Sequence, residues 1–342
     1  LAYANVIEHL HGKTEKGFIP NDNRGNGSKS FDRSQPPVGG IMTKEVYKRY
    51  PEKWFLEATF DYLLGWNRWW VKDRLNEGLL SYGSSPAENP YNEPVFETKT
   101  AAGYESGMDD SPMYIGVPFN REKHTLELQD VGLTSLYIAD CHALAEMAEI
   151  LGRSDERNEL LNRSEQLSYE MESLWDEDLG AYLNYRTDID SHSSRVSPTL
   201  FYPLMAGVAN IDQSEKIVDF FYDSTKFHGD WMLPSTTRDD PLFERQRYWK
   251  GAIWPPLNFL TYLSLRKAGF YNAASELSDK SLKLMITEWN RKGYVSENYS
   301  SITGTGDDSR LSSDRFHSWG ALFGIMSFME YGYMERFEKK IK

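Results

Sequence analysis

Residues 133–174 read LTSLYIADCHALAEMAEILGRSDERNELLNRSEQLSYEMESL, and this stretch decides the fold class. Apolar side chains recur every three or four residues as far as Leu151, which is the spacing of one face of an α-helix. Gly152 then provides a helix stop, and Ser154 with the acidic residues after it provides the start of a second helix. The stretch therefore predicts two long helices joined by a short turn.

The same periodicity recurs along most of the chain. Residues 43–77 predict two helices, with Pro51 at the start of the second. Further helices are predicted at 197–206, 213–223, 254–268, 270–289 and 317–337. We therefore expect an all-α protein with no major β-sheet through residues 130–290.

A weak internal repeat accompanies these helices. Five helical segments are followed by a polar turn, a glycine, an apolar residue and a short extended stretch; the glycines are Gly17, Gly78, Gly180, Gly229 and Gly293. The irregular spacing excludes a solenoid but fits stacked helix hairpins with loops of different length. Since the chain starts inside an amphipathic helix, five units predict a closed ring of six hairpins that lacks its first hairpin.

The start of the chain carries its own expectation. Leu1, Val6 and Leu10 form an apolar stripe with no cap before it. We expect this helix to be the second half of a hairpin whose partner is a missing N-terminal segment or another chain. Residues 1–342 are accordingly predicted to be one catalytic domain, incomplete at its N-terminus.

Composition narrows the classes of partner. The chain has 342 residues, of which 40% are hydrophobic and 14% aromatic, and its net charge is −13. The acidic balance and the lack of a basic run argue against nucleic acid, and no apolar stretch approaches the roughly 20 residues that span a bilayer. The many aromatic residues suit surfaces that pack on sugar rings, although a large helical core also uses aromatic residues. The single cysteine, Cys141, leaves the cellular compartment open.

The tract Tyr104-Glu105-Ser106-Gly107-Met108-Asp109-Asp110-Ser111-Pro112 gathers three carboxylates within six residues. Gly107 and Pro112 predict a non-helical turn, carried by a loop insertion at 79–128. Such a turn can keep one carboxyl protonated beside an ionised one, as proton transfer to a poor leaving group requires. A solvated acidic loop and a calcium-binding turn are the alternatives. A second isolated carboxylate, Glu297, favours glycoside hydrolysis, which uses two such acids.

Two other tracts are candidates for substrate binding. Tyr248, Trp249 and Trp254 surround a glycine just before a helix that Pro255 begins, so their rings are candidates for a pocket wall, with a buried core corner as the alternative. Gln35 lies in an extended loop where its amide can bind two sugar hydroxyls, although a plain connecting loop is also compatible. Asp307 and Asp308 are calcium-like in composition but lack a full ligand spacing, and we predict neither a metal site nor a cofactor.

Six tracts taken together resemble glycoside hydrolase family 63, which includes processing α-glucosidases and the mannosylglycerate and glucosylglycerate hydrolases. The tracts occur in the family's order at 33–37, 105–112, 195–204, 248–254, 297–299 and 316–320. Tyr-Trp-Lys-Gly-Ala-Ile-Trp at 248–254 is the most discriminating, because the Ser-Gly-x-Asp turn at 106–109 is shared with the trehalases of family 37. The resemblance covers nearly the whole chain.

The resemblance implies an (α/α)6 barrel and hydrolysis with inversion at the anomeric carbon. Asp109 matches the family's general acid and Glu297 its general base. Positions that line the subsite for the cleaved sugar match Gln35, Gly107, Tyr248, Trp249 and Trp254. Tyr104 stands at a substrate position where small-glycoside members carry tryptophan, and the family's early Trp-Asp segment is absent from this chain.

The expected substrate is an α-linked oligosaccharide or a small glycoside with an α-glucosidic or related bond. Asp109, with a pKa raised by burial and by Glu105 and Asp110, is expected to protonate the leaving oxygen while Glu297 activates water on the opposite face. Two alternatives remain: a trehalase-like enzyme of a related (α/α)6 family, or a non-catalytic sugar-binding fragment.

Overall fold

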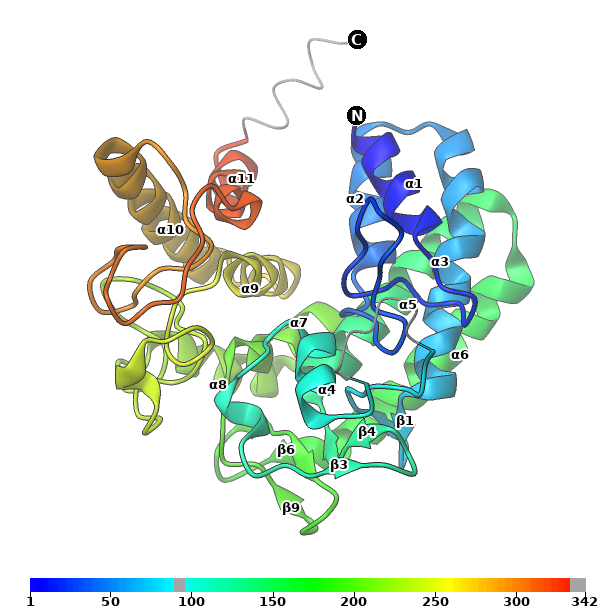
Figure 1. The fold of residues 1–342 in the computed structure, drawn as a ribbon, viewed down its shortest axis with the longest axis horizontal. Helices are drawn as coiled ribbons and strands as arrows, with labels where there is room; N and C mark the ends of the chain where they lie inside the picture. Colours follow the sequence, from blue (N-terminus) through cyan, green and yellow to red (C-terminus); the bar gives the residue numbers. More distant parts are fainter. Residues whose placement is uncertain (89–95, 333–342) are drawn as a thin grey trace. The chain divides into compact units, whose positions relative to one another are not determined.

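The computed structural model describes residues 1–88 and 96–332, and this part of the chain is predominantly helical (Figure 1). Its helices are α1 (Ala2–His11), α2 (Gly39–Arg49), α3 (Lys53–Asp73), α4 (Lys99–Ser106), α5 (Val131–Leu151), α6 (Ser154–Met171), α7 (Tyr202–Ala206), α8 (Ile211–Tyr222), α9 (Pro255–Lys267), α10 (Tyr271–Lys292) and α11 (Leu322–Glu330). Short 3₁₀ turns occur at η1 (Pro112–Tyr114), η2 (Glu172–Leu174), η3 (Pro198–Phe201), η4 (Phe243–Arg245) and η5 (Ser318–Ala321).

The strands are two residues long each. They are β1 (Leu75–Asn76), β2 (Leu79–Leu80), β3 (Phe119–Asn120), β4 (Thr125–Leu126), β5 (Leu128–Gln129), β6 (Trp175–Asp176), β7 (Ala181–Tyr182), β8 (Tyr185–Arg186) and β9 (Ser191–His192). Antiparallel pairs join β1 to β2, β3 to β4, and β8 to both β5 and β9, with Leu75 opposite Leu80 and Tyr185 opposite His192. The expectation that no major sheet crosses 130–290 is confirmed for the residues described.

The predicted helix pairs are confirmed with small shifts at their ends. The stretch 133–174 forms α5 and α6, and α5 begins earlier because Asp130 caps it by accepting the Leu133 N–H at 2.8 Å. Gly152 ends α5 in the left-handed conformation, at φ 74°. Residues 43–77 form α2 and α3, but Pro51 lies in the break before Lys53 rather than in the helix. The helix predicted at 317–337 is η5 and α11, and its last part falls outside the described residues.

The chain falls into two compact units that interleave in sequence. Unit 1 comprises Leu1–Asp109, Gly116–Trp175 and Leu183–His192, and unit 2 comprises Asp110–Ile115, Asp176–Tyr182 and the described residues from Ser193 onward. The 342-residue chain as a single domain remains a prediction. Four of the five repeat glycines have positive φ, whereas Gly229 does not.

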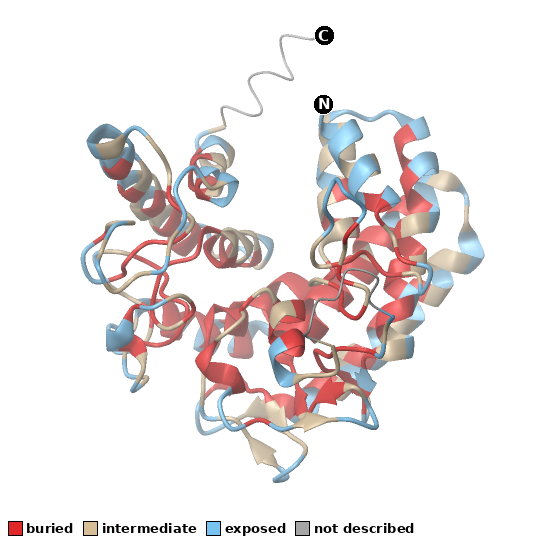
Figure 2. Ribbon diagram, viewed as in Figure 1, coloured by how far each residue is buried: buried red, intermediate tan, exposed pale blue. Residues whose placement is uncertain are grey.

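In unit 1 the core forms around α5. This helix packs against α2, α3 and α6, so it is buried almost all round, as Figure 2 shows by its red ribbon. A helix with apolar residues on most of its sides is expected in such a position. The aromatic residues of α3 supply much of the rest, and Phe55, Phe60 and Trp70 are buried.

A buried polar cluster fixes how α2, α3 and α5 pack. Asp140 on α5 accepts the Gly40 N–H at 2.7 Å and the Asn67 amide at 2.8 Å, while the Tyr137 hydroxyl donates to Asn67 at 2.9 Å. Burial raises the pKa of Asp140 to about 7. Because unpaired polar groups are costly in a core, these bonds favour one register of the three helices.

Helix α1 packs on α2 and α3. The Tyr3 hydroxyl donates to the Tyr50 carbonyl at 2.7 Å, and the Tyr3 ring contacts Trp54 and Phe55. Leu10 is buried and Val6 half-buried, so α2 and α3 cover part of the apolar stripe, whereas Leu1 is exposed. The missing first hairpin remains a prediction.

In unit 2, α9 is the central helix and packs against α7, α10 and α11. Pro255 occupies the first position of α9, as predicted, where its missing N–H costs nothing. Tyr262 and Leu265 from α9 and Phe323 from α11 are fully buried. Among the described residues no helix has both the length and the apolar character that crossing a membrane requires.

Candidate active site

The tract around Asp109 begins as a helix, which corrects the prediction of a wholly non-helical turn. Helix α4 runs to Ser106, so Tyr104 and Glu105 are helical. Gly107 then ends the helix in the left-handed conformation at φ 69°, and the Ser106 hydroxyl accepts the Met108 N–H at 3.0 Å. The turn therefore starts at Gly107 and presents Asp109, which is half-buried. The insertion predicted at 79–128 contains α4 and the short strands β3 and β4, and residues 89–95 of it lie outside the described residues.

Gly103 lets the Asp109 backbone lie directly on α4. A Cβ atom at Gly103 would stand 2.7 Å from the Asp109 carbonyl oxygen, closer than any real contact. Only glycine permits this approach, so the position of the Asp109 turn depends on residue 103.

Gly103→Ala should destabilise the protein and displace Asp109, because a backbone atom cannot move aside as a side chain can. We expect a loss of about 1–3 kcal/mol in the free energy of unfolding and a fall in activity on the order of 10²-fold. Gly65→Ala in α3 is the matched control, since nothing lies within 4 Å of its added Cβ. That variant should gain about 0.5–1 kcal/mol from helix propensity. Thermal unfolding and glycoside hydrolysis measure both effects, and equal stability of the two variants would contradict the assignment.

Glu105 is a structural residue. Its carboxylate makes two bonds to the Arg74 guanidinium, at 2.7 and 2.9 Å, and both side chains are fully buried. The same carboxylate accepts the Ser34 N–H at 2.8 Å and the Gly83 N–H at 2.6 Å. All its charge is therefore compensated by partners, and the expectation that Glu105 raises the pKa of Asp109 as a neighbouring anion is not supported by this arrangement.

The Glu105 network also joins Gln35 to Tyr104. The Ser34 N–H bond holds the loop of Gln35 against the end of α4, and the Arg33 guanidinium lies 5.3 Å from the centre of the Tyr104 ring. The Asn21 amide donates to the Tyr104 carbonyl at 3.0 Å. The Gln35 amide contacts the His9 ring at 2.8 Å. Four predicted site residues thus belong to one part of unit 1, which we call the Asp109 group: Gln35, Tyr104, Gly107 and Asp109.

Asp110 anchors the tryptophan tract within unit 2. Its carboxylate accepts the Trp249 N–H at 3.1 Å and forms an ion pair with Lys250. The two neighbouring carboxylates therefore have different partners. Glu105 binds the Arg74 guanidinium, whereas Asp110 binds the Trp249 N–H and the Lys250 side chain.

The predicted substrate-binding tryptophans stack on one another. The Trp249 and Trp254 rings lie 3.8 Å apart and nearly parallel, at 5°, and both are almost wholly buried. Tyr248 meets Trp254 edge-on at 5.1 Å and accepts its indole N–H through the backbone carbonyl at 2.9 Å. The Trp249 Nε1 is buried with no hydrogen-bond partner among the described residues. The rings therefore form a rigid block that leaves one indole donor unused.

Glu297 lies on an extended segment at the edge of this block. Its N–H donates to the Asp314 carbonyl at 2.9 Å, and its side chain is 14% exposed. Burial raises the pKa of the Glu297 carboxyl, partly offset by the Asp314 N–H and by His317. His317 contacts Trp319 at 4.8 Å between ring centres, and Trp319 contacts Trp254 at 5.9 Å. Unit 2 thereby brings together Tyr248, Trp249, Trp254 and Glu297, the Glu297 group.

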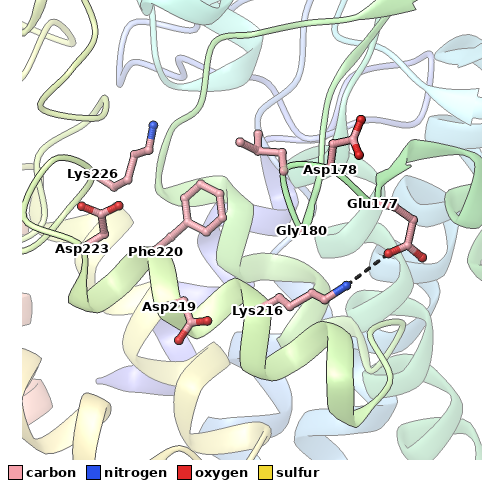
Figure 3. A pocket seen from close by; sticks show the side chains of 9 residues that line it. Glu177, Asp178, Gly180, Lys216, Asp219, Phe220, Asp223 and Lys226 are labelled. Carbon is pink, nitrogen blue, oxygen red and sulfur yellow. Dashed lines mark hydrogen bonds and ion pairs between the residues drawn. The ribbon is translucent and has the colours of Figure 1, made fainter.

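A pocket of about 380 Å³ lies elsewhere in unit 2, between α8 and the turn after β6 (Figure 3). Lys216 on α8 reaches across it to Glu177, at 3.1 Å. It contains none of the predicted site residues. The calcium-like Asp307 and Asp308 are paired with Arg291 and Arg310, at 2.7 Å each, so their charge is already matched by protein cations.

The sequence predicts neither the structural role of Arg74, which pairs with Glu105, nor the place of His317 beside Glu297. His317 belongs to the 316–320 tract that the sequence singles out without assigning a function to it. Arg74 follows the aromatic helix α3 and carries no local signal of its partner, because Glu105 lies 31 residues away.

Comparison with known proteins shows the family of this chain. Residues 2–319 match the family model of the mannosylglycerate hydrolase MGH1-like glycoside hydrolase domain. Alpha-glucosidase 2 of Arabidopsis thaliana is 22% identical over 86% of this chain and 42% of its own length. Mannosylglycerate hydrolase MGH1 of Selaginella moellendorffii is 23% identical over 80% of this chain and 62% of its own length. The chain thus spans about half the length of these relatives.

Solved structures share the fold. The family 63 mannosylglycerate hydrolase of Thermus thermophilus in complex with glucose superposes with a TM-score of 0.73 at 20% identity, covering 94% of this chain and 86% of that one. Neutral trehalase Nth1 of Saccharomyces cerevisiae gives 0.74 at 19% identity, covering 96% and 68%. The fold class expected from the sequence, all-α of the (α/α)6 type, is confirmed. The chain belongs to the MGH1-like glycoside hydrolases of family 63.

Proposed function

We propose that this chain is an inverting glycosidase that cleaves α-glucosidic or related α-glycosidic bonds, with Asp109 as general acid and Glu297 as general base. In this reaction Asp109 gives its proton to the glycosidic oxygen as the bond breaks. Glu297 takes a proton from a water molecule, and that water attacks the anomeric carbon from the opposite face. One displacement therefore inverts the configuration.

The surroundings of Glu297 carry the proposal. A carboxyl whose pKa is raised by burial is a stronger base than an exposed one, provided that it is ionised at the working pH. The His317 ring lies beside Glu297 and contacts the Trp319 ring. Trp319 in turn contacts Trp254 of the tryptophan block. A carboxylate beside an aromatic surface suits a sugar, since aromatic rings pack on its apolar C–H faces while the base reaches water.

The substrate class is an α-linked oligosaccharide or a small glycoside, since the named relatives include a mannosylglycerate hydrolase and an α-glucosidase.

The product's configuration tests the proposal. Incubation with an α-glycoside, followed at once by ¹H NMR, should show the β-anomer first, with the α-anomer appearing later by mutarotation. The panel for the anomer test should contain p-nitrophenyl α-glucoside, mannosylglycerate and glucosylglycerate. Trehalose is compared by rate alone, because inverting hydrolysis of this α,α-linked disaccharide releases one α-glucose and one β-glucose together. Glu297→Gln should lose at least about 10²-fold in kcat, since an amide does not act as a base. First appearance of the α-anomer, or full activity of Glu297→Gln, would refute the mechanism.

A further inference from the structure

The segment of Glu297 pairs with a second extended segment in unit 2. The Glu297 N–H donates to the Asp314 carbonyl, the Phe316 N–H donates to the Val295 carbonyl, both at 2.9 Å, and Ser296 faces Arg315 in an antiparallel bridge. Residues opposite one another in such a ladder share a face, and faces alternate along each strand. Regular alternation would therefore place His317 on the face of Ser296, away from Glu297.

Phe316 breaks this alternation. Its φ is +58°, a left-handed conformation that is unfavourable for a bulky residue. Burial of the ring does not explain it, since Phe316 is 74% exposed. As a result, the side chain of the next residue, His317, lies beside Glu297, with 3.9 Å between His317 Nε2 and Glu297 Oε1. Strain kept in this way at a candidate site indicates that the resulting geometry is used.

The other ring nitrogen of His317 is already engaged. Nδ1 accepts the backbone N–H of Trp319 at 3.4 Å and so caps η5. With Nδ1 as acceptor, neutral imidazole carries its proton on Nε2. The Trp319 ring packs beside the imidazole. The Trp319 contacts therefore orient the ring and favour the tautomer whose Nε2–H faces Glu297.

We propose that His317 is a positioning residue for Glu297, holding the carboxylate ionised and aimed at the attacking water through its Nε2–H. This inference rests on the proposed function of Glu297 as the base. The separation of 3.9 Å makes the contact electrostatic in the ligand-free state, and such contacts tighten when substrate binds. His317 does not touch the reacting atoms in this scheme.

The charges around Glu297 determine in which direction its pKa should shift when His317 is replaced. The Asp314 carboxylate raises the pKa of Glu297, whereas the Asp314 N–H, the Asn298 amide and His317 lower it. Loss of the His317 ring should therefore raise that pKa further. Because the base must be ionised to act, the acid limb of kcat/KM should move to higher pH, by about 0.5–1 unit.

Two variants separate positioning from capping. His317→Asn places an acceptor where Nδ1 stands, so it keeps the Trp319 cap but has nothing at the Nε2 position. His317→Gln places an N–H near the Nε2 position but loses the cap. We expect His317→Asn to retain the wild-type melting temperature, to lose about tenfold in kcat at neutral pH with KM unchanged, and to show the shifted acid limb. His317→Gln should melt lower but keep more of the activity.

The assay uses p-nitrophenyl α-glucoside and mannosylglycerate, with Glu297→Gln alongside. If Glu297→Gln is inactive while His317→Asn has the wild-type pH profile and kcat, the positioning role is wrong and the proposed function stands. If Glu297→Gln is fully active, the proposed function fails first. Phe316→Gly is the matched control for the backbone: it relieves the left-handed strain and leaves His317 in place, so its pH profile should match the wild type. If Phe316→Gly shifts the acid limb, the double variant with His317→Asn should shift it no further, and an additive shift would overturn the role assigned here.

Discussion

Asp109→Asn should abolish most hydrolysis of glycosides with poor leaving groups. An amide has no proton to give, and general acid catalysis contributes about 10²–10⁴-fold. We expect kcat for mannosylglycerate or an α-linked disaccharide to fall by about 10³-fold or more. The p-nitrophenoxide group needs little protonation, so p-nitrophenyl α-glucoside should lose far less. The ratio of the two rates, measured on the same preparation, reports the acid directly.

Asp110→Asn is the matched control for this experiment. Asp110 accepts the Trp249 N–H and pairs with Lys250, so its loss should affect both kinds of substrate equally. If Asp110→Asn instead shows the dependence on leaving group and Asp109→Asn does not, the acid is Asp110. Equal, small losses for both variants would leave neither residue as the acid.

Arg74→Met should cause the largest loss of stability. Glu105 would remain as a buried carboxylate without its cation, and breaking one side of a buried pair costs about 3–5 kcal/mol. In a chain of 342 residues that corresponds to a fall in melting temperature of about 4–7 °C. Urea unfolding followed by tryptophan fluorescence gives the free energy. Activity should fall as well, because Glu105 holds both the Gln35 loop and α4.

An exposed ion pair gives the comparison. Arg68 and Glu159 are bonded at 2.9 Å but are 51% and 36% exposed, so Arg68→Met should cost less than about 1 kcal/mol. The double variant Arg74→Met with Glu105→Leu should recover part of the loss, since no charge is then left buried. Equal stability of the Arg68 and Arg74 variants would show that the buried pair does not hold unit 1 together.

Most helices are predictable from sequence because their signals are local. The apolar spacing up to Leu151, the stop at Gly152 and the start at Pro255 each depend on a few neighbouring residues. The catalytic candidates come from motif resemblance. That unit 2 gathers Glu297 with the tryptophan tract agrees with it.

Tertiary contacts are not predictable in the same way. No residue close to Glu105 in the sequence indicates that Arg74 will be its counter-charge. Gly107 indicates that a helix is interrupted, but not that a helix precedes it, so the sequence predicts a non-helical tract where the structure has the end of α4. The burial of Trp249 and Trp254 depends on their stacking, which spacing alone does not reveal. The left-handed Phe316 is invisible to propensity, since phenylalanine rarely adopts that conformation.

The different partners of Glu105 and Asp110 limit how portable the segment around Asp109 is. A designer who grafted residues 104–112 onto another scaffold would transfer two carboxylates whose cations stay behind, Arg74 for one and Lys250 for the other. Each carboxylate without its counter-charge would then become hydrated or change the conformation of the turn, and the grafted segment would not keep the geometry it has here. The smallest transplantable piece is therefore a set of segments distant in sequence, because the short acidic motif does not bring its counter-charges with it.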